Sequence, residues 1–373
     1  MFAWEQRKLG DVAEIVGGGT PSTKKSEYWN GNINWFSPAE IGNQIFVSHS
    51  QKQITELGLM KSSAKILPAG TILFTSRAGI GNTAILTRNA CTNQGFQSIV
   101  PYSNKLDSYF IYSESAKLKR YGETMGSGST FTEVSGKQMR KMSLHIPNIN
   151  EQAKIGNMLK ILDQTITLHE EKKRQLERLK IALLQKMFAN KNGYPAVRFE
   201  GFSNEWEHCK LGDVADITTG SRNHQDSVTD GKYPFFVRSD KVERLNEYDF
   251  DTKAILVPGD GRIGEIFHYY NGKFALHQRV YKVDNFNGIN ELFLLGLFKY
   301  SFKEHALRLN AQGTVPSLRL PMFTNWSISV PMITEQERIG VFFQKLERTI
   351  SLYDHKLELL KKVKRSMLQA MFI

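Results

Sequence analysis

The sequence predicts an α+β protein in which two globular domains of mixed α/β structure are joined by two long helices that pair as an antiparallel coiled coil. A pseudo-twofold internal repeat relates the two halves. Three observations carry this prediction: a nearly identical block opens each half, a long heptad pattern closes each half, and short strand-like runs punctuated by glycine lie between them.

Composition sets broad limits on the fold and on the partners. The 373 residues are enough for two or three domains, and a hydrophobic content of 40% is enough to form buried cores. The formal net charge of +12 favours a polyanionic partner such as nucleic acid, because each neutralised phosphate releases counterions. Two cysteines, Cys91 and Cys209, exclude a disulfide framework and a multi-cysteine zinc site. The sequence has neither a signal-peptide pattern nor a run of about 18 apolar residues, so we expect a cytoplasmic protein with no membrane partner.

The repeat is sharpest at the two ends of each half. Residues 4–15 return as residues 206–217 with nine of twelve positions identical, at an offset of 202. Residues 147–156 return as residues 331–340 at the smaller offset of 184, so the intervening segment is shorter in the second half. The centres match only loosely. Shared ends predict a shared scaffold and partner, and divergent centres predict different contacts in each half; drift after an old duplication is the alternative.

A helix of about 38 residues is predicted at the end of each half. Apolar residues step by four and three, which is the spacing of a coiled-coil seam. Proline and an acidic first turn precede each helix, and glycine and proline follow the first one. The predicted seam comprises Ile155, Leu159, Leu162, Ile166, Leu176 and Leu183 in the first helix, and Ile339, Phe343, Leu346, Ile350, Leu357 and Leu360 in the second. The predicted boundaries are therefore 1–146 and 193–330 for the globular domains, and 147–192 and 331–373 for the helices.

Short strands and one helix are predicted in each globular half. The strand-like runs are bounded by glycine and polar residues, as in a mixed α+β domain. The predicted strands are residues 66–74, 83–86 and 98–101 in the first half, and 254–257, 266–270 and 280–283 in the second. The predicted helices are residues 109–120 and 291–302.

Polar loops follow the repeated blocks and are the candidate DNA contacts. Arginine, lysine, asparagine, glutamine, serine and histidine are the residue types that contact phosphates and base edges. The alternative is that these are ordinary surface turns. The first-half candidates are Thr20, Ser22, Lys24, Lys25, Arg77, Asn82, Asn93, Gln94, Ser129 and Thr130. The second-half candidates are Ser221, Arg222, Asn223, His224, Arg238, Arg262, His277, Gln278, Arg279 and Thr314.

Two glycine-rich segments resemble phosphate-binding motifs. Residues 259–264 fit G-x-G-x-x-G, and residues 79–84 fit its looser form. A dinucleotide-binding motif requires a helix to follow, whereas strands are predicted after both segments, so tight turns are favoured. The sequence has no P-loop, no H-E-x-x-H, no Asn-Pro-Pro-aromatic tetrapeptide and no G-x-S-x-G. We therefore expect neither catalytic residues nor a metal site on this chain.

The order of these motifs resembles the specificity subunit of type I restriction–modification enzymes. The likeness covers essentially the whole chain. It is carried by residues 8–13 and 210–215, 19–22, 76–81, 93–96, 128–131 and the two Pro-x-x-x-Glu-Gln-x-x-Ile helix starts. The second half departs from the usual pattern, because it has Gly-Ser-Arg-Asn at 220–223 and His-Gln-Arg-Val at 277–280.

The resemblance implies two target-recognition domains that each read one half of a bipartite, asymmetric site in double-stranded DNA. It implies that the helices set the spacer and dock two methyltransferase (modification) subunits, with restriction–translocation subunits added for cleavage. No cofactor is expected on this chain, because S-adenosylmethionine, ATP and Mg would bind the partner subunits. The alternatives are a coiled-coil scaffold without sequence-specific DNA binding and, less favoured, a stand-alone enzyme.

Overall fold

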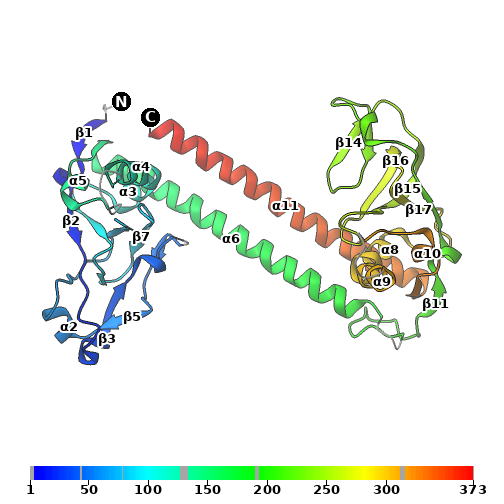
Figure 1. Ribbon diagram of the computed structural model, residues 1–373, viewed down its shortest axis with the longest axis horizontal. Helices are drawn as coiled ribbons and strands as arrows, with labels where there is room; N and C mark the ends of the chain where they lie inside the picture. Colours follow the sequence, from blue (N-terminus) through cyan, green and yellow to red (C-terminus); the bar gives the residue numbers. More distant parts are fainter. Residues whose placement is uncertain are drawn as a thin grey trace. The chain divides into compact units, whose positions relative to one another are not determined.

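The chain forms two compact units. The computed structural model describes residues 4–42, 44–77, 79–126, 133–189, 193–310 and 316–372. Unit 1 comprises Met1–Leu168 with Leu357–Ile373, and unit 2 comprises His169–Lys356. Figure 1 shows the helices and strands of each unit. Both long helices, α6 (Ile149–Met187) and α11 (Ile333–Met371), contribute residues to both units.

Unit 1 contains a five-stranded sheet of order β2-β9-β6-β7-β4, a three-stranded sheet of order β5-β3-β8 and the pair β1-β10. Helices α3 and α4 cover the larger sheet, and Phe110 and Leu118 pack with Ile72, Phe74 and Ile99 in one buried cluster. The strands are β1 (Glu5–Lys8), β2 (Ala13–Gly17), β3 (Trp29–Phe36), β4 (Phe46–Val47), β5 (Lys52–Ile54), β6 (Ile72–Phe74), β7 (Thr83–Leu86), β8 (Cys91–Thr92), β9 (Gln97–Pro101) and β10 (Ser143–Ile146). The short helices are α1 (Leu9–Val12), α2 (Glu56–Met60), α3 (Ser108–Ser113), α4 (Ser115–Gly126) and α5 (Gly136–Arg140).

Unit 2 contains one six-stranded sheet of order β12-β17-β15-β16-β13-β14 and the pair β11-β18. Its core is rich in aromatic rings: Phe293, Phe298, Phe302 and Trp326 lie in one buried cluster. The strands are β11 (Glu207–Lys210), β12 (Asp216–Thr219), β13 (Tyr233–Phe236), β14 (Val242–Leu245), β15 (Phe250–Pro258), β16 (His268–Leu276), β17 (Val280–Asp284) and β18 (Ser327–Val330). The short helices are α7 (Leu211–Val214), α8 (Glu291–Leu297), α9 (Lys303–Leu309) and α10 (Leu320–Thr324), with the π-helical segment Phe298–Phe302 between α8 and α9.

The sequence repeat is a structural repeat. In unit 1, Ile99 of β9 faces Ile15 of β2 and Ile72 of β6. In unit 2, Val283 of β17 faces Ile217 of β12 and Ile255 of β15. The pairs β1-β10 and β11-β18 are both antiparallel and join the first repeated block to the strand before the long helix. The two units therefore share strand registers as well as motifs.

The repeated Glu-Gln motif braces each long helix against the globular part. Gln152 is fully buried; its side-chain oxygen accepts a hydrogen bond from Asp107 N at 3.0 Å, and its Nε2 donates to Pro147 O at 2.8 Å. Gln336 repeats this arrangement with Asn290 N at 2.8 Å and Pro331 O at 2.8 Å. Because a buried amide is costly to leave unpaired, the motif fixes where each helix begins.

The glycine that follows each Glu-Gln motif allows close helix packing. A Cβ on Gly156 would lie 2.5 Å from Asp107 Oδ1, and a Cβ on Gly340 would lie 2.8 Å from Asn290 Oδ1. Both contacted residues cap a globular helix: Asp107 Oδ1 accepts from two amides of α3, and Asn290 Oδ1 from two amides of α8. Only glycine fits there, which explains its recurrence at an offset of 184.

The long helices pack against each other in an antiparallel sense. In unit 1, Ile155 and Leu159 near the start of α6 join a cluster with Leu368 and Phe372 at the end of α11. In unit 2, the end of α6 meets the start of α11, where Leu183 and Met187 pack with Ile339 and Phe343. The twelve predicted seam residues are all buried or half-buried: Ile155, Leu159, Leu162, Ile166, Leu176, Leu183, Ile339, Phe343, Leu346, Ile350, Leu357 and Leu360.

The predicted α+β fold class is confirmed, with local differences. The helix predicted over 109–120 is two helices, α3 and α4, separated at Glu114, and the helix predicted over 291–302 continues as a π-helical segment into α9. The strand predicted over 66–74 is only β6, because bridges and turns form the rest. Strands β7 and β16 follow the two glycine-rich segments, so the tight-turn interpretation is confirmed. In the described residues, no helix combines the length and apolarity needed to cross a membrane.

Candidate nucleic-acid interface

Three segments of unit 1 meet at one end of the sheets, and we call them loop cluster 1: residues 18–20, 92–95 and 75–77. Gly19 N donates to Thr92 O at 2.8 Å, Asn93 N to Phe36 O at 3.0 Å, and Ser76 N to Gly95 O at 2.8 Å. A Cβ on Gly18 would lie 1.9 Å from Asn93 O. Backbone bonds and a glycine contact therefore hold these loops together, which leaves their side chains available.

Four predicted contact residues come together in loop cluster 1. The Thr20 hydroxyl donates to Gln94 Oε1, and Asn93 Oδ1 accepts from Gly95 N at 2.8 Å. The Arg77 guanidinium lies 3.8 Å from Glu133 Oε2 and is only partly covered. Gln94 is exposed, and Thr20, Arg77 and Asn93 are half-buried. The cluster thus offers donors, acceptors and one cation, the mixture that base edges and phosphates require.

The remaining unit 1 candidates lie beside this cluster. Ser22, Lys24 and Lys25 are exposed. Lys25 Nζ lies 5.2 Å from the centre of the Tyr28 ring, and Tyr28 and Glu27 raise the pKa of Lys25. Asn82 Nδ2 donates to Ile41 O at 3.4 Å, so this side chain is tied to a neighbouring turn. Ser129 and Thr130 lie outside the described residues.

Unit 2 builds the same backbone frame, which we call loop cluster 2: residues 220–224, 276–279 and 259–262. His277 N donates to Phe236 O at 3.0 Å, and Gly259 N donates to Arg279 O at 2.8 Å. A Cβ on Gly220 would lie 2.0 Å from Leu276 O. These contacts match those of Asn93, Ser76 and Gly18, so both units hold their loops in one geometry.

The side chains of loop cluster 2 form a different set of pairs. Arg222 binds Asp249 at 2.8 Å and Glu247 at 2.9 Å, and these hydrogen bonds raise the pKa of Arg222. Gln278 Nε2 donates to Asn223 Oδ1 at 2.7 Å. Two carboxylates hold the Arg222 guanidinium, which orients it and neutralises its charge.

His277 is buried, with 4% of its surface exposed, and its Nδ1 accepts from Arg279 N at 3.0 Å. Burial, assisted by the nearby positive charge of Arg238, lowers the pKa of His277. The buried His277 ring therefore stabilises the turn, whereas Gln278 and Arg279 on the same turn are exposed.

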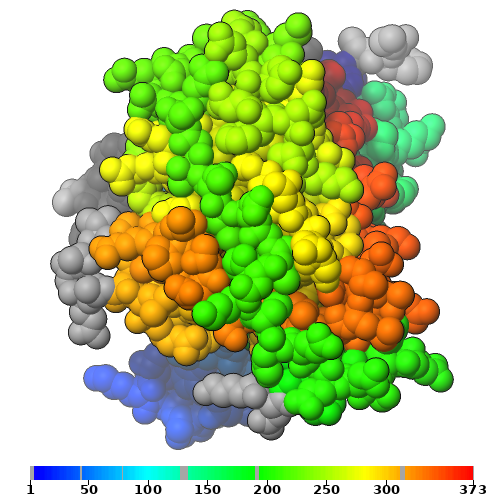
Figure 2. Space-filling view, turned by 90° about the vertical axis from the view of Figure 1, so that its right-hand side faces the viewer, coloured from blue at the N-terminus to red at the C-terminus, as the bar shows by residue number. Residues whose placement is uncertain are grey.

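The other unit 2 candidates include three exposed arginines, Arg238, Arg262 and Arg279. Arg238 and Arg279 both approach Asp260 Oδ2, at 3.3 and 3.8 Å, so two cations share one carboxylate. His224 Nε2 lies 2.9 Å from Glu243 Oε1, and Arg262 Nε donates to Glu265 at 2.9 Å. Ser221 is exposed, and Thr314 lies outside the described residues. In Figure 1, strand β14 lies at the end of unit 2 away from α9, and Figure 2 shows the same end of the unit in green and yellow-green.

Matching backbone positions of the two clusters carry different chemistry. The bond from Ser76 N to Gly95 O matches the bond from Gly259 N to Arg279 O. Gly95 in unit 1 therefore corresponds to Arg279 in unit 2. The residue after each donor is Arg77 in unit 1 and Asp260 in unit 2, which inverts the charge.

Sequence reasoning missed the acidic residues of the clusters. Glu133, Asp249, Glu247 and Asp260 each pair with a predicted arginine. The first three lie outside the matched motifs, Asp260 lies inside the glycine-rich segment 259–264, and no spacing links any of them to its partner. Among the described residues, no group of three or more His, Cys, Asp or Glu side chains is arranged to hold a metal ion.

Comparisons with known proteins agree with this geometry. The family model for the type I restriction modification DNA specificity domain matches residues 1–178 and 203–362. The chain is 28% identical over 414 residues to the type I restriction enzyme MjaIX specificity subunit of Methanocaldococcus jannaschii, covering 98% of this chain and 91% of that protein. It is 32% identical over 192 residues to the EcoR124I/EcoR124II specificity subunit of Escherichia coli, covering 49% of this chain and 46% of that protein.

A solved structure has the same fold. The crystal structure of the type I restriction–modification S subunit from M. genitalium superposes with a TM-score of 0.70 at 16% identity, covering 99% of this chain and 96% of that one. The family model matches both repeats and nearly the whole chain. The chain therefore belongs to the family of type I restriction–modification DNA specificity subunits.

Proposed function

We propose that loop clusters 1 and 2 each read one half of a bipartite DNA site, so that this chain supplies sequence specificity to a complex. The observation that carries the proposal is the shared backbone frame with different side chains. A common frame presents each loop set to a duplex in the same way, and different donors, acceptors and cations select different bases. An asymmetric site follows from this arrangement.

The proposed DNA contacts are exposed residues in or beside each cluster. In unit 1 these are Gln94, Lys24 and Lys25, and in unit 2 they are Arg238, Gln278 and Arg279. Glutamine can donate and accept toward adenine, and arginine can bind guanine or phosphate. Arg222 reaches DNA only after leaving Asp249 and Glu247, so its proposed role is to orient the loop.

The long helices are the proposed docking surface for two methyltransferase subunits. Apolar residues outside the seam remain exposed on them: Ile161 and Leu359 in unit 1, and Ile181 and Leu352 in unit 2. Burying these side chains against a partner would remove apolar surface from water, which favours association. Restriction–translocation subunits would join this complex for cleavage. We propose that the chain is non-catalytic and that S-adenosylmethionine, ATP and Mg bind the partner subunits.

Family membership favours this function over a coiled-coil scaffold that lacks sequence-specific DNA binding. The test is to reconstitute the full chain with its methyltransferase subunits and to map methylated adenines across a genome. We expect one motif of two short specific parts separated by a fixed non-specific spacer. A single continuous motif, or methylation without sequence preference, would contradict the proposal.

A domain exchange separates the roles of the two units. Residues 1–146 are replaced by the corresponding domain of another family member, and methylation is mapped again. The part of the motif that loop cluster 1 reads should change, while the other part and the spacer stay the same. A change in both parts would refute independent reading by the two clusters.

A further inference from the structure

A carboxylate at the same repeat position on each long helix binds a lysine from the other long helix. On α6, Asp163 Oδ1 lies 2.5 Å from Lys364 Nζ of α11. On α11, Glu347 Oε1 lies 2.7 Å from Lys180 Nζ of α6. The repeat offset of 184 relates Asp163 to Glu347, and the same offset relates Lys180 to Lys364. The same ion pair therefore occurs once in each unit.

In unit 2 the carboxylate has a third partner from the globular part. Lys299 Nζ lies 2.6 Å from Glu347 Oε1 and comes from the π-helical segment between α8 and α9. Burial alone would raise the pKa of Glu347, but the two ammonium groups outweigh it and hold that pKa below its ordinary value. Burial lowers the pKa of Lys299 despite its pairing with Glu347. Such a half-buried cluster has few alternative arrangements, because an unpaired charge there is costly.

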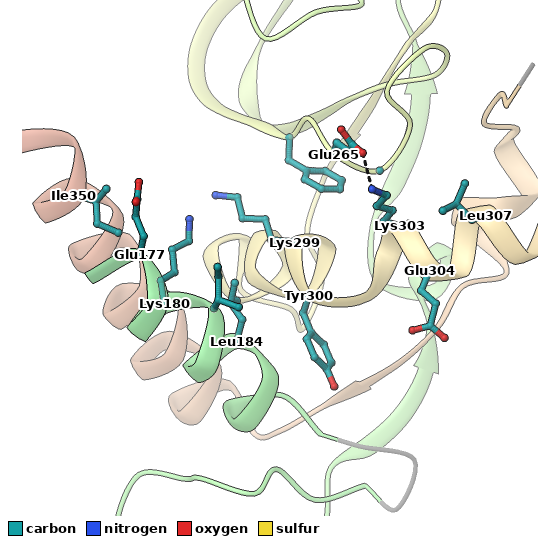
Figure 3. A pocket seen from close by; sticks show the side chains of 13 residues that line it. Glu177, Lys180, Leu184, Glu265, Lys299, Tyr300, Lys303, Glu304, Leu307 and Ile350 are labelled. Atoms are coloured by element: carbon teal, nitrogen blue, oxygen red, sulfur yellow. Dashed lines mark hydrogen bonds and ion pairs between the residues drawn. The ribbon is translucent and has the colours of Figure 1, made fainter. Parts of the chain in front are cut away.

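Figure 3 shows the pocket beside this junction, where Lys180 of α6 and Lys299 reach toward each other. The pocket has a volume of about 950 Å³, and Tyr300 also lines it. Lys299 lies on a π-helical turn, and such turns occur often at functional positions.

In unit 1 the equivalent carboxylate also reaches the globular part, through a different residue. The Tyr109 hydroxyl of α3 donates to Asp163 Oδ2 at 2.9 Å. Asp163 has 6% of its surface exposed, and burial followed by the Asp163 contact raises the pKa of Tyr109. Each carboxylate thus ties together two long helices and one helix of its own globular domain.

We propose that Asp163 and Glu347 are positioning residues that fix how each recognition domain is held on the paired helices. Through that attachment they set how strictly the complex selects its spacer length. The proposal rests on the proposed function, since spacer selection has meaning only for a bipartite site. A buried ion pair adds little net stability compared with apolar packing, but it strongly disfavours shifted arrangements that leave a charge unpaired. The two junctions therefore fix the geometry of the attachment more than they raise its stability.

The test measures spacer discrimination. Glu347→Gln is introduced into the full chain, which is assembled with its methyltransferase subunits. Methylation rates are measured on duplexes that carry both half-sites with the native spacer or with one base pair more or fewer. We expect the preference for the native spacer to fall about tenfold, while the penalty for a mismatched half-site stays unchanged. Equal loss on all duplexes would overturn the proposal.

Two further variants isolate the junction. Lys299→Met removes the contact with the recognition domain but keeps the ion pair between the helices, so it should reproduce the loss of spacer discrimination. If Glu347→Gln does not fold, Lys299→Met still tests the proposal. Asp354→Asn is the matched control, because Asp354 binds Lys173 of the other helix at 2.6 Å and, among the residues that the structure describes, no third partner from the globular part joins this pair. Asp354→Asn should leave spacer discrimination unchanged.

The outcomes separate this proposal from the proposed function. A wild-type complex without a bipartite motif would refute the function itself. A wild-type complex with a sharp spacer preference that Lys299→Met retains would refute only the positioning role. Spacer discrimination lost equally in Asp354→Asn would also refute that role, since any ion pair between the helices would then suffice.

Discussion

The ion pair between Arg198 and Glu335 in unit 2 allows a sharp test of how the repeat is stabilised. Arg198 lies in the segment between α6 and β11, and Glu335 lies in the first turn of α11. The guanidinium binds both carboxylate oxygens at 2.7 Å. The Glu335 side chain is 0% exposed and the Arg198 side chain is 14% exposed, so solvent screens this pair very little.

Arg198→Met leaves the buried Glu335 carboxylate without its cation. Removing one partner of a buried pair costs about 3–5 kcal/mol, because the remaining charge is not compensated. The first turn of α11 offsets part of this cost, since a helix N-terminus stabilises an anion by about 0.3–1 kcal/mol. We therefore expect the free energy of unfolding of unit 2 to fall by about 2–4 kcal/mol. The double variant Arg198→Met with Glu335→Leu should recover most of that loss.

Hydrogen exchange read by mass spectrometry is the suitable assay, because it reports stability segment by segment in a chain with two units. Peptides from β15 to β17 should lose protection in Arg198→Met, while those from β6 to β9 should not. A loss below about 1 kcal/mol in unit 2 would refute the reasoning, since an uncompensated buried carboxylate costs more than that.

The same repeat position in unit 1 provides the control. Glu151 is the counterpart of Glu335 at the offset of 184. It is half-buried, and within the described part of the chain its carboxylate accepts one long hydrogen bond, from Trp4 Nε1 at 3.3 Å. Glu151→Gln should cost about 1 kcal/mol or less, whereas Glu335→Gln should cost clearly more because it breaks a bidentate pair. Equal costs at the two positions would contradict the role given to burial.

Three other perturbations follow from the structure. Gly340→Ala puts a Cβ 2.8 Å from Leu292 Cβ and from Phe293 N; overpacking of about 1–3 kcal/mol outweighs a helix-propensity gain of about 1 kcal/mol, so urea unfolding should show a less stable unit 2. Burial lowers the pKa of both His277 and His305 in the folded state. The stability that the neutral rings contribute is present above the unfolded pKa, about 6.5, and is lost as the pH falls through the folded pKa values. His277→Gln should therefore flatten the decline in the urea midpoint between about pH 7.5 and 5.5. Arg279→Ala should weaken binding at one half-site by about 1–3 kcal/mol in competition assays, and a uniform loss over all sequences would indicate a phosphate contact instead.

The repeated elements were predictable because their sequence signals are local. A heptad pattern and a Pro-x-x-x-Glu-Gln start define α6 and α11 through spacing alone, and both helices begin just after the predicted prolines. The break at Glu114 was not predictable from periodicity. The Glu114 side chain is buried and binds Lys117 at 2.9 Å, and neither its burial nor this pair is visible in the spacing of apolar residues.

The loops were predictable as polar segments, but not as sets of partners. The pairing of Arg222 with Asp249 and Glu247 joins two loops, and so does the pairing of Arg238 with Asp260. Such contacts depend on the register in which the strands pair, and side chains of the whole sheet determine that register rather than one local segment. The burial of His277 has the same origin, because a one-residue change of register would turn that ring outward.

The length difference between the halves falls where it least disturbs the loop clusters. Between the matched strands, unit 1 has the segment 37–71 and unit 2 has the much shorter segment 237–254, which accounts for nearly all of the change in offset from 202 to 184. In unit 1 this segment supplies β4, β5 and α2, whereas in unit 2 it supplies β14. Strands β4 and β14 both lie at a sheet edge, where a change breaks few hydrogen bonds.

The strands that hold the loop clusters tolerate no such change. Strand β9 pairs on both sides, with β2 and β6, and β17 pairs on both sides, with β12 and β15. An insertion in β9 or β17 would shift the register of two strand pairs at once. It would also separate the loops that touch at Gly18 within unit 1, or those that touch at Gly220 within unit 2. Selection for new DNA sites can therefore vary the sheet edge and the exposed loop side chains independently of the frame. This explains why the two halves keep nearly identical ends and matching strand registers while their centres differ in length and charge.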